Sequence, residues 1–236
     1  MTVAATPHQW VQVIESWDET PSLRSIAFRM PDEYCWSHRK PGQVVKVRTP
    51  AGEGYFALAT APVTHPRGEL LMKRGGRVAD TAIELAADGG SLDISPPFGG
   101  GFPVEDGHDR DVLLFAAGSG IAPIRAIVQH VLANRARFRR VTLFYGQRHG
   151  SEFAYAREHL AWDRGGIRVV LCPSQEDDAW PGMRGRVQQV ASTLALGGAE
   201  PAETTAFVCG MTAMVDDVRA TLADAGVPPE HVHLNF

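Results

Sequence analysis

Residues 111–125, DVLLFAAGSGIAPIR, decide the fold of this chain. Asp111–Ala116 is an almost continuous apolar run, which is typical of a strand buried on both faces of a parallel sheet. Gly118 and Gly120 follow, and Pro123 suits the first turn of a helix, where its missing N–H costs no hydrogen bond. The segment therefore predicts a strand, a tight glycine turn and the start of a helix.

The glycine turn, Ala116–Pro123, has two interpretations. Glycine lets the backbone turn sharply and approach a ligand, and the N–H groups at a helix N-terminus attract phosphate groups. A tight turn without any ligand explains the same residues equally well. The spacing matches neither the GxGxxG fingerprint of Rossmann folds nor the GxSxG elbow of serine hydrolases, so a serine hydrolase is disfavoured.

The chain downstream of Gly107 alternates between strand patterns and helix patterns. Such alternation predicts a parallel sheet with helices on both faces. The expected strands after the first are Val141–Tyr145, Ile167–Cys172, Thr205–Cys209 and His231–Leu234. The expected helices are Ile121–Arg135, Glu152–Trp162, Val187–Leu196 and Thr212–Ala225.

The chain upstream of residue 105 has a different character, with short β-rich runs separated by turn residues. Only Val78–Ala87 has a helical pattern, so this half predicts a small antiparallel β-barrel. We therefore expect two domains, a barrel at 1–104 and an α/β parallel-sheet domain at 110–236, joined by the polar linker Pro103–Arg110. The expected barrel strands are Trp10–Trp17, Leu23–Met30, Gln43–Arg48, Tyr55–Ala59, Glu69–Lys73 and Ser91–Ser95.

The composition excludes several classes of protein. The 236 residues carry a formal net charge of −4, which argues against a general nucleic-acid surface. Cys35, Cys172 and Cys209 are far apart and form no CxxC motif, so this chain is not expected to hold an iron–sulfur cluster. His231 and His233 lack a third ligand at a suitable spacing, so no metal site is expected. No secretory signal or membrane span is visible, and we expect a cytoplasmic protein.

Glycine, cysteine and other small residues gather at the ends of the predicted parallel strands. Ligands of open α/β sheets bind outside the carboxyl ends of the strands, so we expect a ligand site at this edge. A buried Cys209 that acts as a small hydrophobic residue is the commoner alternative for that cysteine. The strand-end residues are Gly118–Gly120, Tyr145 with Gly146, Cys172–Ser174, and Cys209 with Gly210.

Three segments outside the predicted parallel sheet carry further signals. Lys73, Arg74 and Arg77 surround the N-terminus of the predicted helix, which suits either a phosphate group or an ordinary solvated turn. Ser95–Phe102 (SPPFGGGF) is a rigid turn followed by a flexible one. The terminal Phe236 directly follows a predicted strand, so it is either a frayed end or a ring held against a flat group.

In this order, the segments resemble the ferredoxin–NADP reductase-like family of flavoproteins over nearly the whole chain. LLFAAGSGIAPIRAI, LFYGQR and VCGMTAMVDDVRATLADAGV are similar to the family's nucleotide loop, its next strand end and its Cys-Gly segment. In the barrel half, YFALATAP falls at the flavin strand, GGRVADTAIEL at the helix that takes the flavin pyrophosphate, and SPPFGGGFP at the link between domains. LCPSQEDDAWPGMRGRVQQV resembles a branch of plant and bacterial members that lack an iron–sulfur domain.

The resemblance implies FAD on the barrel and NAD(P)H at the carboxyl edge of the sheet. It also implies that Cys209 lies beside the nicotinamide and that Phe236 covers the flavin, and these two are the candidate catalytic residues. The candidate FAD-binding residues are Phe56, Ala57, Leu58, Ala59, Thr60, Met72, Lys73, Arg74, Gly75, Gly76, Arg77, Val78, Ala79 and Phe236. The candidate NAD(P)-binding residues are Gly118, Ser119, Gly120, Ile121, Ala122, Pro123, Tyr145, Gly146, Arg148, Ser174, Gln175, Cys209, Gly210, Met211 and Met214.

Three positions depart from the Arg-x-Tyr-Ser pattern of the family's flavin strand. Gly54 stands in place of the arginine that neutralises the flavin pyrophosphate, and Phe56 in place of the tyrosine. Ala57 replaces the serine whose hydroxyl donates toward flavin N5. We expect the cations at the helix N-terminus to supply the missing charge, and backbone N–H groups of Ala57–Ala59 to serve the ring.

The segment after the third parallel strand bears on the choice of nucleotide. Gln175 stands where NADP-using relatives often have the arginine of a Ser-Arg pair that holds the 2′-phosphate. Acidic residues repel a phosphate and can accept a hydrogen bond from a ribose hydroxyl, and three of them follow: Glu176, Asp177 and Asp178. We therefore expect NADH, while three arginines that could pair with the extra phosphate keep NADPH open: Arg148, Arg184 and Arg186.

Three functions are compatible with the sequence. The favoured one is an FAD-dependent oxidoreductase, in which hydride passes between NAD(P)H and flavin and electrons then reach an acceptor that the sequence does not identify. The protein's task in such a reaction is positioning rather than acid–base chemistry. The alternatives are an electron-transfer subunit of a larger complex and a non-catalytic nucleotide-binding protein on a degenerate reductase scaffold.

Overall fold

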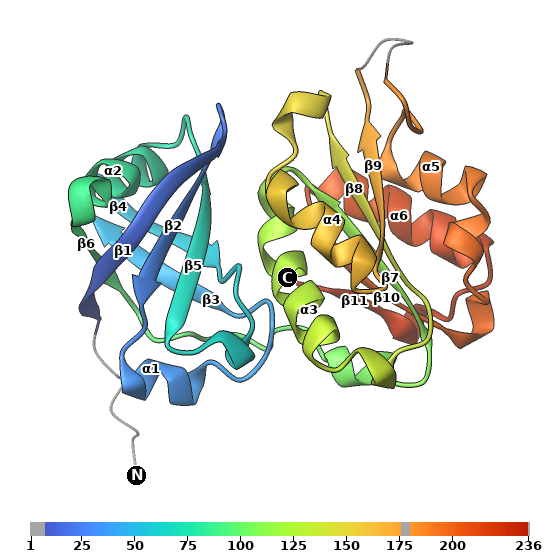
Figure 1. The fold of residues 1–236 in the computed structure, drawn as a ribbon, viewed down its shortest axis with the longest axis horizontal. Helices are drawn as coiled ribbons and strands as arrows, with labels where there is room; N and C mark the ends of the chain where they lie inside the picture. Colours follow the sequence, from blue (N-terminus) through green and yellow to red (C-terminus); the bar gives the residue numbers. More distant parts are fainter. Residues whose placement is uncertain (1–7, 176–179, 236) are drawn as a thin grey trace.

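The computed structural model describes residues 8–175 and 180–235. Two sheets lie side by side, the first half of the chain on the left of Figure 1 and the second half on the right. This arrangement confirms the expected fold class, an antiparallel barrel followed by a parallel α/β sheet. The domain limits at residues 104 and 110 stay predictions. None of the helices in the described residues is long and apolar enough to cross a membrane.

The barrel consists of six antiparallel strands in the order β4-β3-β6-β1-β2-β5. Alternation places Val11 and Val13 of β1 in the core, whereas Trp10 faces solvent. Beyond β4, Leu58 forms an isolated antiparallel bridge with Leu70 of β5, so the two edges of the sheet meet. The strands are β1 (Gln9–Thr20), β2 (Leu23–Arg29), β3 (Val44–Thr49), β4 (Gly52–Ala57), β5 (Arg67–Lys73) and β6 (Ser91–Ile94).

Two α-helices accompany the barrel in the described residues, where the sequence pattern predicts only one. Helix α2 (Arg77–Leu85) matches the expected helix, but α1 (Asp32–Ser37) is absent from the prediction. At six residues, α1 is too short to show a helical period of apolar residues. Tertiary contact fixes it instead, because the buried Tyr34 donates a hydrogen bond from its hydroxyl to the carbonyl oxygen of Ile94 at 3.1 Å.

The second sheet has five parallel strands in the order β11-β10-β7-β8-β9. Its helices lie on both faces of the sheet (Figure 1). The strands are β7 (Asp111–Ala117), β8 (Val141–Gln147), β9 (Arg168–Pro173), β10 (Thr204–Cys209) and β11 (Val232–Leu234). The helices are α3 (Ile121–Ala133), α4 (Ala156–Arg164), α5 (Val187–Thr193) and α6 (Thr212–Asp224).

Alternate residues of β7 explain why this sheet needs helices on both faces. Leu114 belongs to a buried cluster with residues of α3 and α4, whereas Leu113 belongs to another with residues of α5 and α6. Both leucines are at most 1% exposed. A strand covered on both sides needs apolar residues at consecutive positions, which is the pattern of the opening sequence stretch.

The helix expected over Glu152–Trp162 begins later than predicted, at Ala156. Tyr155, the residue before it, has a φ of +59°, in the left-handed region where a right-handed helix cannot continue. The backbone N–H of Tyr155 donates to Oε2 of Glu19 in β1 at 2.7 Å. A contact with the barrel thus accompanies the start of α4. The spacing of apolar residues in the helix cannot predict this contact.

The two domains share one apolar core at their junction. Phe102, which precedes the linker, is fully buried and packs edge-to-face on Phe207 of β10, with ring centroids 5.6 Å apart. Val104 belongs to the same cluster, together with Leu23 and Leu71 of the barrel. The end of the barrel segment is therefore packed into the α/β domain.

Replacement of Phe102 tests the shared core. Phe102→Ala is expected to lower the free energy of unfolding by about 3–5 kcal/mol, because it removes a fully buried ring and leaves a cavity. The control is Phe98→Ala, at a ring that is 41% exposed, with an expected loss below about 1 kcal/mol. Denaturant unfolding measures both values, and equal losses would contradict the placement of Phe102 in the core.

Candidate functional site

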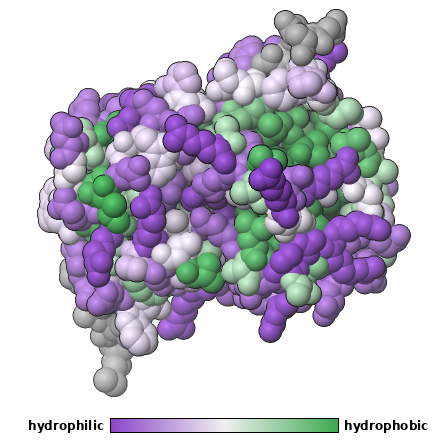
Figure 2. Space-filling model, in the orientation of Figure 1, coloured by the Kyte–Doolittle hydropathy of each residue, from purple (hydrophilic) through white to green (hydrophobic). Residues whose placement is uncertain are grey.

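The carboxyl ends of four parallel strands meet at one edge of the sheet. The register pairs Cys209 of β10 with Ala116 of β7, and Ala117 of β7 with Gly146 of β8. Gly146 in turn pairs with Cys172 of β9. The ends of β8 and β9 lie at the top of the sheet in Figure 1, and hydrophobic residues gather over the upper part of the α/β half in Figure 2. The structure thus brings the expected strand-end residues together.

The glycine loop Gly118–Gly120 is a single 3-10 turn that leads directly into α3. Gly118 has a φ of +58°, a conformation that side chains disfavour. A Cβ at Gly120 would lie 2.4 Å from the carbonyl oxygen of Cys209 and 3.1 Å from the backbone nitrogen of Gly210. Only glycine at position 120 therefore lets the loop lie against the end of β10.

The N-terminus of α3 is built to receive an anion. No side chain caps the helix at Gly120. The side chains of Ile121, Ala122 and Pro123 are buried, so these residues offer a ligand their backbone, while Ser119 is half-buried at the loop tip. N–H groups without a side-chain partner, together with the helix dipole, favour a phosphate at this position.

Cys209 lies at the carboxyl end of β10, beside the loop. Burial raises the pKa of the Cys209 thiol to about 12, so the group is neutral near pH 7. A neutral thiol can contact a ring but does not act as a thiolate nucleophile. Met211 is 74% exposed, whereas Met214 is a core residue whose methyl group lies under Gly210. Of the two candidate methionines, only Met211 therefore faces outward.

Tyr145 supports the loop from inside the protein. Its ring is fully buried, and its hydroxyl accepts hydrogen bonds from the side-chain amide of Gln147 at 2.9 Å and from the N–H of Ala154 at 3.2 Å. The same hydroxyl donates to the carbonyl oxygen of Gly118 at 3.5 Å. Tyr145 therefore holds the loop in place rather than facing a ligand.

A cavity of about 520 Å³ opens beside the end of β9. The exposed Arg148 is distant in the chain but lies beside this segment, because its carbonyl oxygen accepts the N–H of Gln175 at 2.9 Å. The acidic residues Glu176, Asp177 and Asp178 lie outside the described residues. The cavity is lined by Ser174, Gly182, Met183, Arg184 and Gly185.

The expected flavin strand ends in a tightly packed segment. A Cβ at Gly54 would lie 3.0 Å from Cε2 of Phe56 and 3.1 Å from Cγ1 of Val78. Phe56 and Val78 therefore occupy the space in which the family's arginine side chain would begin. Ala57 is half-buried, and the next three residues are buried: Leu58, Ala59 and Thr60.

Two backbone groups expected to serve the flavin ring already have partners inside the barrel. The N–H of Leu58 donates to the carbonyl oxygen of Gln43 at 2.9 Å, and the N–H of Ala59 donates to the carbonyl oxygen of Glu69 at 2.8 Å. The expectation that these N–H groups bind the ring is therefore wrong for Leu58 and Ala59, because they complete the hydrogen bonding of the barrel strands.

Two groups expected to hold a phosphate at α2 already have partners. Arg74 forms an ion pair with Asp18 of β1 at 2.6 Å, and the hydrogen bonds from Arg24 and Arg74 lower the pKa of Asp18. The N–H of Gly75 donates to both carboxylate oxygens of Asp80, at 3.0 Å and 3.2 Å. Both partners are acidic residues whose role the sequence pattern does not reveal.

The groups left for an anion at α2 are Lys73, Arg77 and the N-terminal backbone. Both side chains are exposed, and no side chain caps the helix at Gly76. Met72 and Ala79, also among the candidate residues, belong to the barrel core. A phosphate site at this helix is therefore smaller than the sequence motif suggests.

Phe236 lies outside the described residues, so its candidate catalytic role stays a prediction. Asn235, its neighbour, lies at a barrel turn, because a Cβ at Gly42 would come within 2.8 Å of Oδ1 of Asn235. The described end of the chain thus returns to the junction of the two domains.

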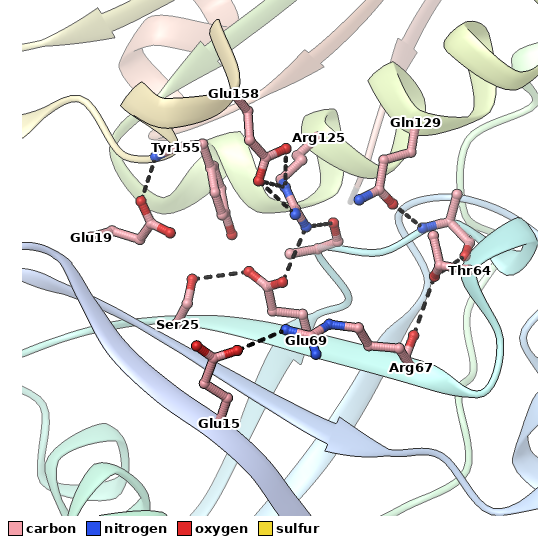
Figure 3. Close-up of polar contacts among 12 residues, drawn as sticks. Glu15, Glu19, Ser25, Thr64, Arg67, Glu69, Arg125, Gln129, Tyr155 and Glu158 are labelled. Carbon is pink, nitrogen blue, oxygen red and sulfur yellow. Dashed lines mark hydrogen bonds and ion pairs between the residues drawn. The ribbon is translucent and has the colours of Figure 1, made fainter. Parts of the chain in front are cut away.

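The sequence patterns do not reveal one polar cluster that lies between the two domains. Arg125 of α3 reaches Glu69 of β5 at 3.3 Å and Glu158 of α4 at 2.7 Å (Figure 3). Its signal in the sequence is a lone arginine among apolar helix residues. Its partners could not be identified there, because they lie 56 and 33 residues away along the chain.

Substitution of Gly120 tests the loop geometry. Gly120→Ala is expected to raise the dissociation constant for NADH at least about 10-fold, because the added methyl group pushes the loop away from β10. FAD content should stay unchanged. Gly100→Ala is the matched control, since nothing lies within 4 Å of the added atom. Calorimetric titration measures both variants, and a wild-type affinity for Gly120→Ala would rule out this loop as the anchor.

Comparison with known proteins agrees with this geometry. A family model described as "Oxidoreductase NAD-binding domain" matches residues 114–220. The chain is 30% identical to the ferredoxin reductase component of 3-ketosteroid-9-alpha-monooxygenase from Rhodococcus rhodochrous, over 99% of this chain and 67% of that protein. It is 28% identical to subunit gamma of sulfhydrogenase 1 from Pyrococcus furiosus, over 96% of this chain and 78% of that one.

The fold leads to the same group of proteins. A ferredoxin NADP+ reductase from Neisseria gonorrhoeae, solved with bound FAD and NADP, superimposes with a TM-score of 0.82 at 20% identity, over 97% of this chain and 98% of that one. Barrel, glycine loop and Cys-Gly strand end follow each other here in the order that the family requires. The chain therefore belongs to the ferredoxin–NADP reductase-like family of FAD- and NAD(P)-binding oxidoreductases.

Proposed function

We propose that this protein is an FAD-dependent reductase that takes hydride from NADH and passes electrons to a protein acceptor. The observation that carries the proposal is the contact of the Gly120 loop with the Cys209 end of β10. This contact sets an open helix N-terminus beside a strand end that carries a neutral thiol. The relatives named above as a reductase component and a reductase support the same activity.

The α/β domain fits a nicotinamide dinucleotide. The first turn of α3 would hold its pyrophosphate, and the cavity beside Ser174 would take its adenosine end. Cys209 and Gly210 would then lie against the nicotinamide. Because burial keeps the thiol protonated, Cys209 would act through packing and not as a thiolate.

The barrel fits FAD through fewer charged groups than the family pattern contains. Lys73 and Arg77 would face its pyrophosphate at the uncapped N-terminus of α2, and the segment Ala57–Ala59 would pack against its ring. When bound, FAD supplies the hydride-accepting and one-electron chemistry. The residues of this chain bind, orient the two rings and exclude water, since alignment of the reacting atoms is the main catalytic requirement of such a transfer.

An anaerobic titration tests the function. Protein loaded with FAD is mixed with NADH, and the flavin absorbance is expected to bleach with one equivalent of nucleotide. Protein that takes up no FAD, or whose flavin stays oxidised with both NADH and NADPH, would contradict the proposal and favour a nucleotide-binding protein without activity.

An electron-transfer subunit of a larger complex is the second candidate. The Pyrococcus and Rhodococcus relatives are named as a subunit and a component. Large apolar side chains are also exposed on the barrel, among them Trp10 at 67% and Trp36 at 78%. Flavin bleaching by NADH combined with slow transfer to small soluble acceptors would favour this candidate.

The choice of NADH rests on the residue that follows Ser174. Gln175 brings no charge to this segment, and Arg186 lies 3.8 Å from Asp217, which offsets its charge. Arg184, which lines the cavity, is the residue that keeps NADPH open. Gln175→Arg is expected to raise kcat/KM for NADPH about 10-fold while leaving NADH nearly unchanged, because a guanidinium pairs with the 2′-phosphate.

Gln175→Ala is the matched control for this substitution, since it removes the side chain without adding charge. Steady-state kinetics with both nucleotides measure the effect. A wild-type preference for NADPH, or equal changes for both nucleotides in Gln175→Arg, would contradict the expected selectivity.

A further inference from the structure

Arg125 connects the nucleotide loop to the barrel. It lies in α3, the helix that starts at the glycine loop, and its side chain is only 9% exposed. Figure 3 shows the guanidinium pointing out of α3 toward the loop and strand of the barrel. A buried arginine at this point joins the element that would anchor the nicotinamide dinucleotide to the domain that would hold the flavin.

The nitrogens of the Arg125 guanidinium donate hydrogen bonds to both domains. Nη1 donates to the carbonyl oxygen of Ala59 at 2.9 Å and to Oε2 of Glu69 at 3.3 Å. Nε and Nη2 donate to the carboxylate of Glu158 at distances between 2.7 Å and 3.0 Å. Cζ of Arg125 also lies 4.5 Å from the ring centre of Tyr155. Such a fork is a property of arginine that lysine cannot reproduce.

Ala59 is the important partner, because it is the last residue of the segment proposed to support the flavin ring. Its N–H donates to the backbone carbonyl of Glu69 at 2.8 Å, while its own carbonyl accepts from Arg125. Leu58, one residue earlier, donates its N–H to the carbonyl of Gln43 at 2.9 Å. The strand end is therefore held from the barrel side by backbone bonds and from the α/β side by Arg125.

Charge keeps this arrangement in one geometry. Burial alone would lower the pKa of Arg125, but the hydrogen bonds to Glu158 and the charge of Glu69 outweigh it, so the group stays cationic. The Glu69 carboxylate is also bonded by the hydroxyl of Ser25 at 2.9 Å. Buried ion pairs are weak sources of stability but penalise any arrangement that separates them. The cluster is therefore better suited to fixing an orientation than to stabilising the fold.

We propose that Arg125 is a positioning residue for hydride transfer: it binds the Ala59 carbonyl and Glu69 together and so fixes the nucleotide loop relative to the flavin-supporting strand. This inference rests on the proposed function. Hydride transfer is sensitive to small displacements, and a shift of about 1 Å can cost about 100-fold in rate. Arg125 acts on the alignment of the two rings and touches neither of them.

Arg125→Lys tests the inference because it keeps the charge and loses the fork. The rate of flavin reduction at saturating NADH is expected to fall about 10- to 100-fold, with dissociation constants for NADH and FAD within about 3-fold of wild type. The charge-transfer absorbance between reduced flavin and NAD+ should weaken in parallel. A merely structural role would lower the melting temperature and leave this absorbance and the rate unchanged.

Gln129→Ala is the matched control. Gln129 lies one turn further along α3 and also reaches the barrel, where its Oε1 accepts the N–H of Ala61 at 2.9 Å. It carries no charge, and its hydrogen bond goes to Ala61 instead of Ala59 or Glu69. The rate of flavin reduction in Gln129→Ala is expected to stay within about 3-fold of wild type. A rate loss as large as that of Arg125→Lys would overturn the specific role of Arg125.

A measurement without flavin separates this inference from the proposed function. Hydrogen exchange of the amides at residues 58–61 is expected to be faster in flavin-free Arg125→Lys than in flavin-free wild type, because the strand end loses its clamp. Unchanged exchange would overturn the inference even if the enzyme is an active reductase. If NADH fails to reduce the flavin of the wild-type protein, the proposed function is wrong. The exchange measurement would still test whether Arg125 holds the strand end.

Glu158→Gln provides a second test of the role of Arg125 if Arg125→Lys does not fold. The Glu158 side chain is 34% exposed at the rim of the cluster, so its neutral isostere is expected to fold. Weaker hydrogen bonds to Arg125 should slow flavin reduction about 3- to 10-fold. A wild-type rate together with wild-type exchange at residues 58–61 would overturn the proposal.

Discussion

The close approach of the glycine loop to the end of β10 is the constraint on which the site depends. An atom added at Gly120 would come within 2.4 Å of the Cys209 carbonyl oxygen, closer than any tolerated contact. This approach is possible because β7 and β10 are neighbours in the sheet, with Ala116 paired to Cys209. The topology of the sheet therefore sets the N-terminus of α3 beside the Cys209 end of β10, and the proposed nucleotide site rests on that placement.

Much of this arrangement follows from the sequence. The apolar run of β7 predicts a strand buried on both faces, and the alternation downstream predicts the parallel sheet whose edge collects Gly118, Gly146 and Cys209. The spacing of apolar residues predicts neither α1 nor the late start of α4, because tertiary hydrogen bonds accompany both. The same limit applies within the site, where Tyr145 and Met214 lie in the core although their motif positions suggest a ligand.

The barrel half shows why charge in a sequence is a poor guide to binding. Lys73, Arg74 and Arg77 look alike as neighbouring exposed cations, yet the charge of Arg74 is offset by an ion pair with Asp18. Asp80 takes the N–H of Gly75 that a phosphate would otherwise use. Only the fold shows which charges have local partners. Arg125 is the reverse case, since an inconspicuous arginine in a helix joins three segments that are distant in the chain.

The apolar cluster at the junction limits how far the two domains can be treated as interchangeable modules. Phe102 and Val104 arrive from the barrel side of the chain but pack among residues of β7 and α3. A chimaera with a foreign barrel would lose Leu23 and Leu71 from that cluster and leave Phe207 facing an unmatched surface, and apolar side chains beside a gap lose their packing contacts. Residues on both sides of the domain junction would have to be transplanted together. A substitution on one side of this junction would also restrict the substitutions allowed on the other.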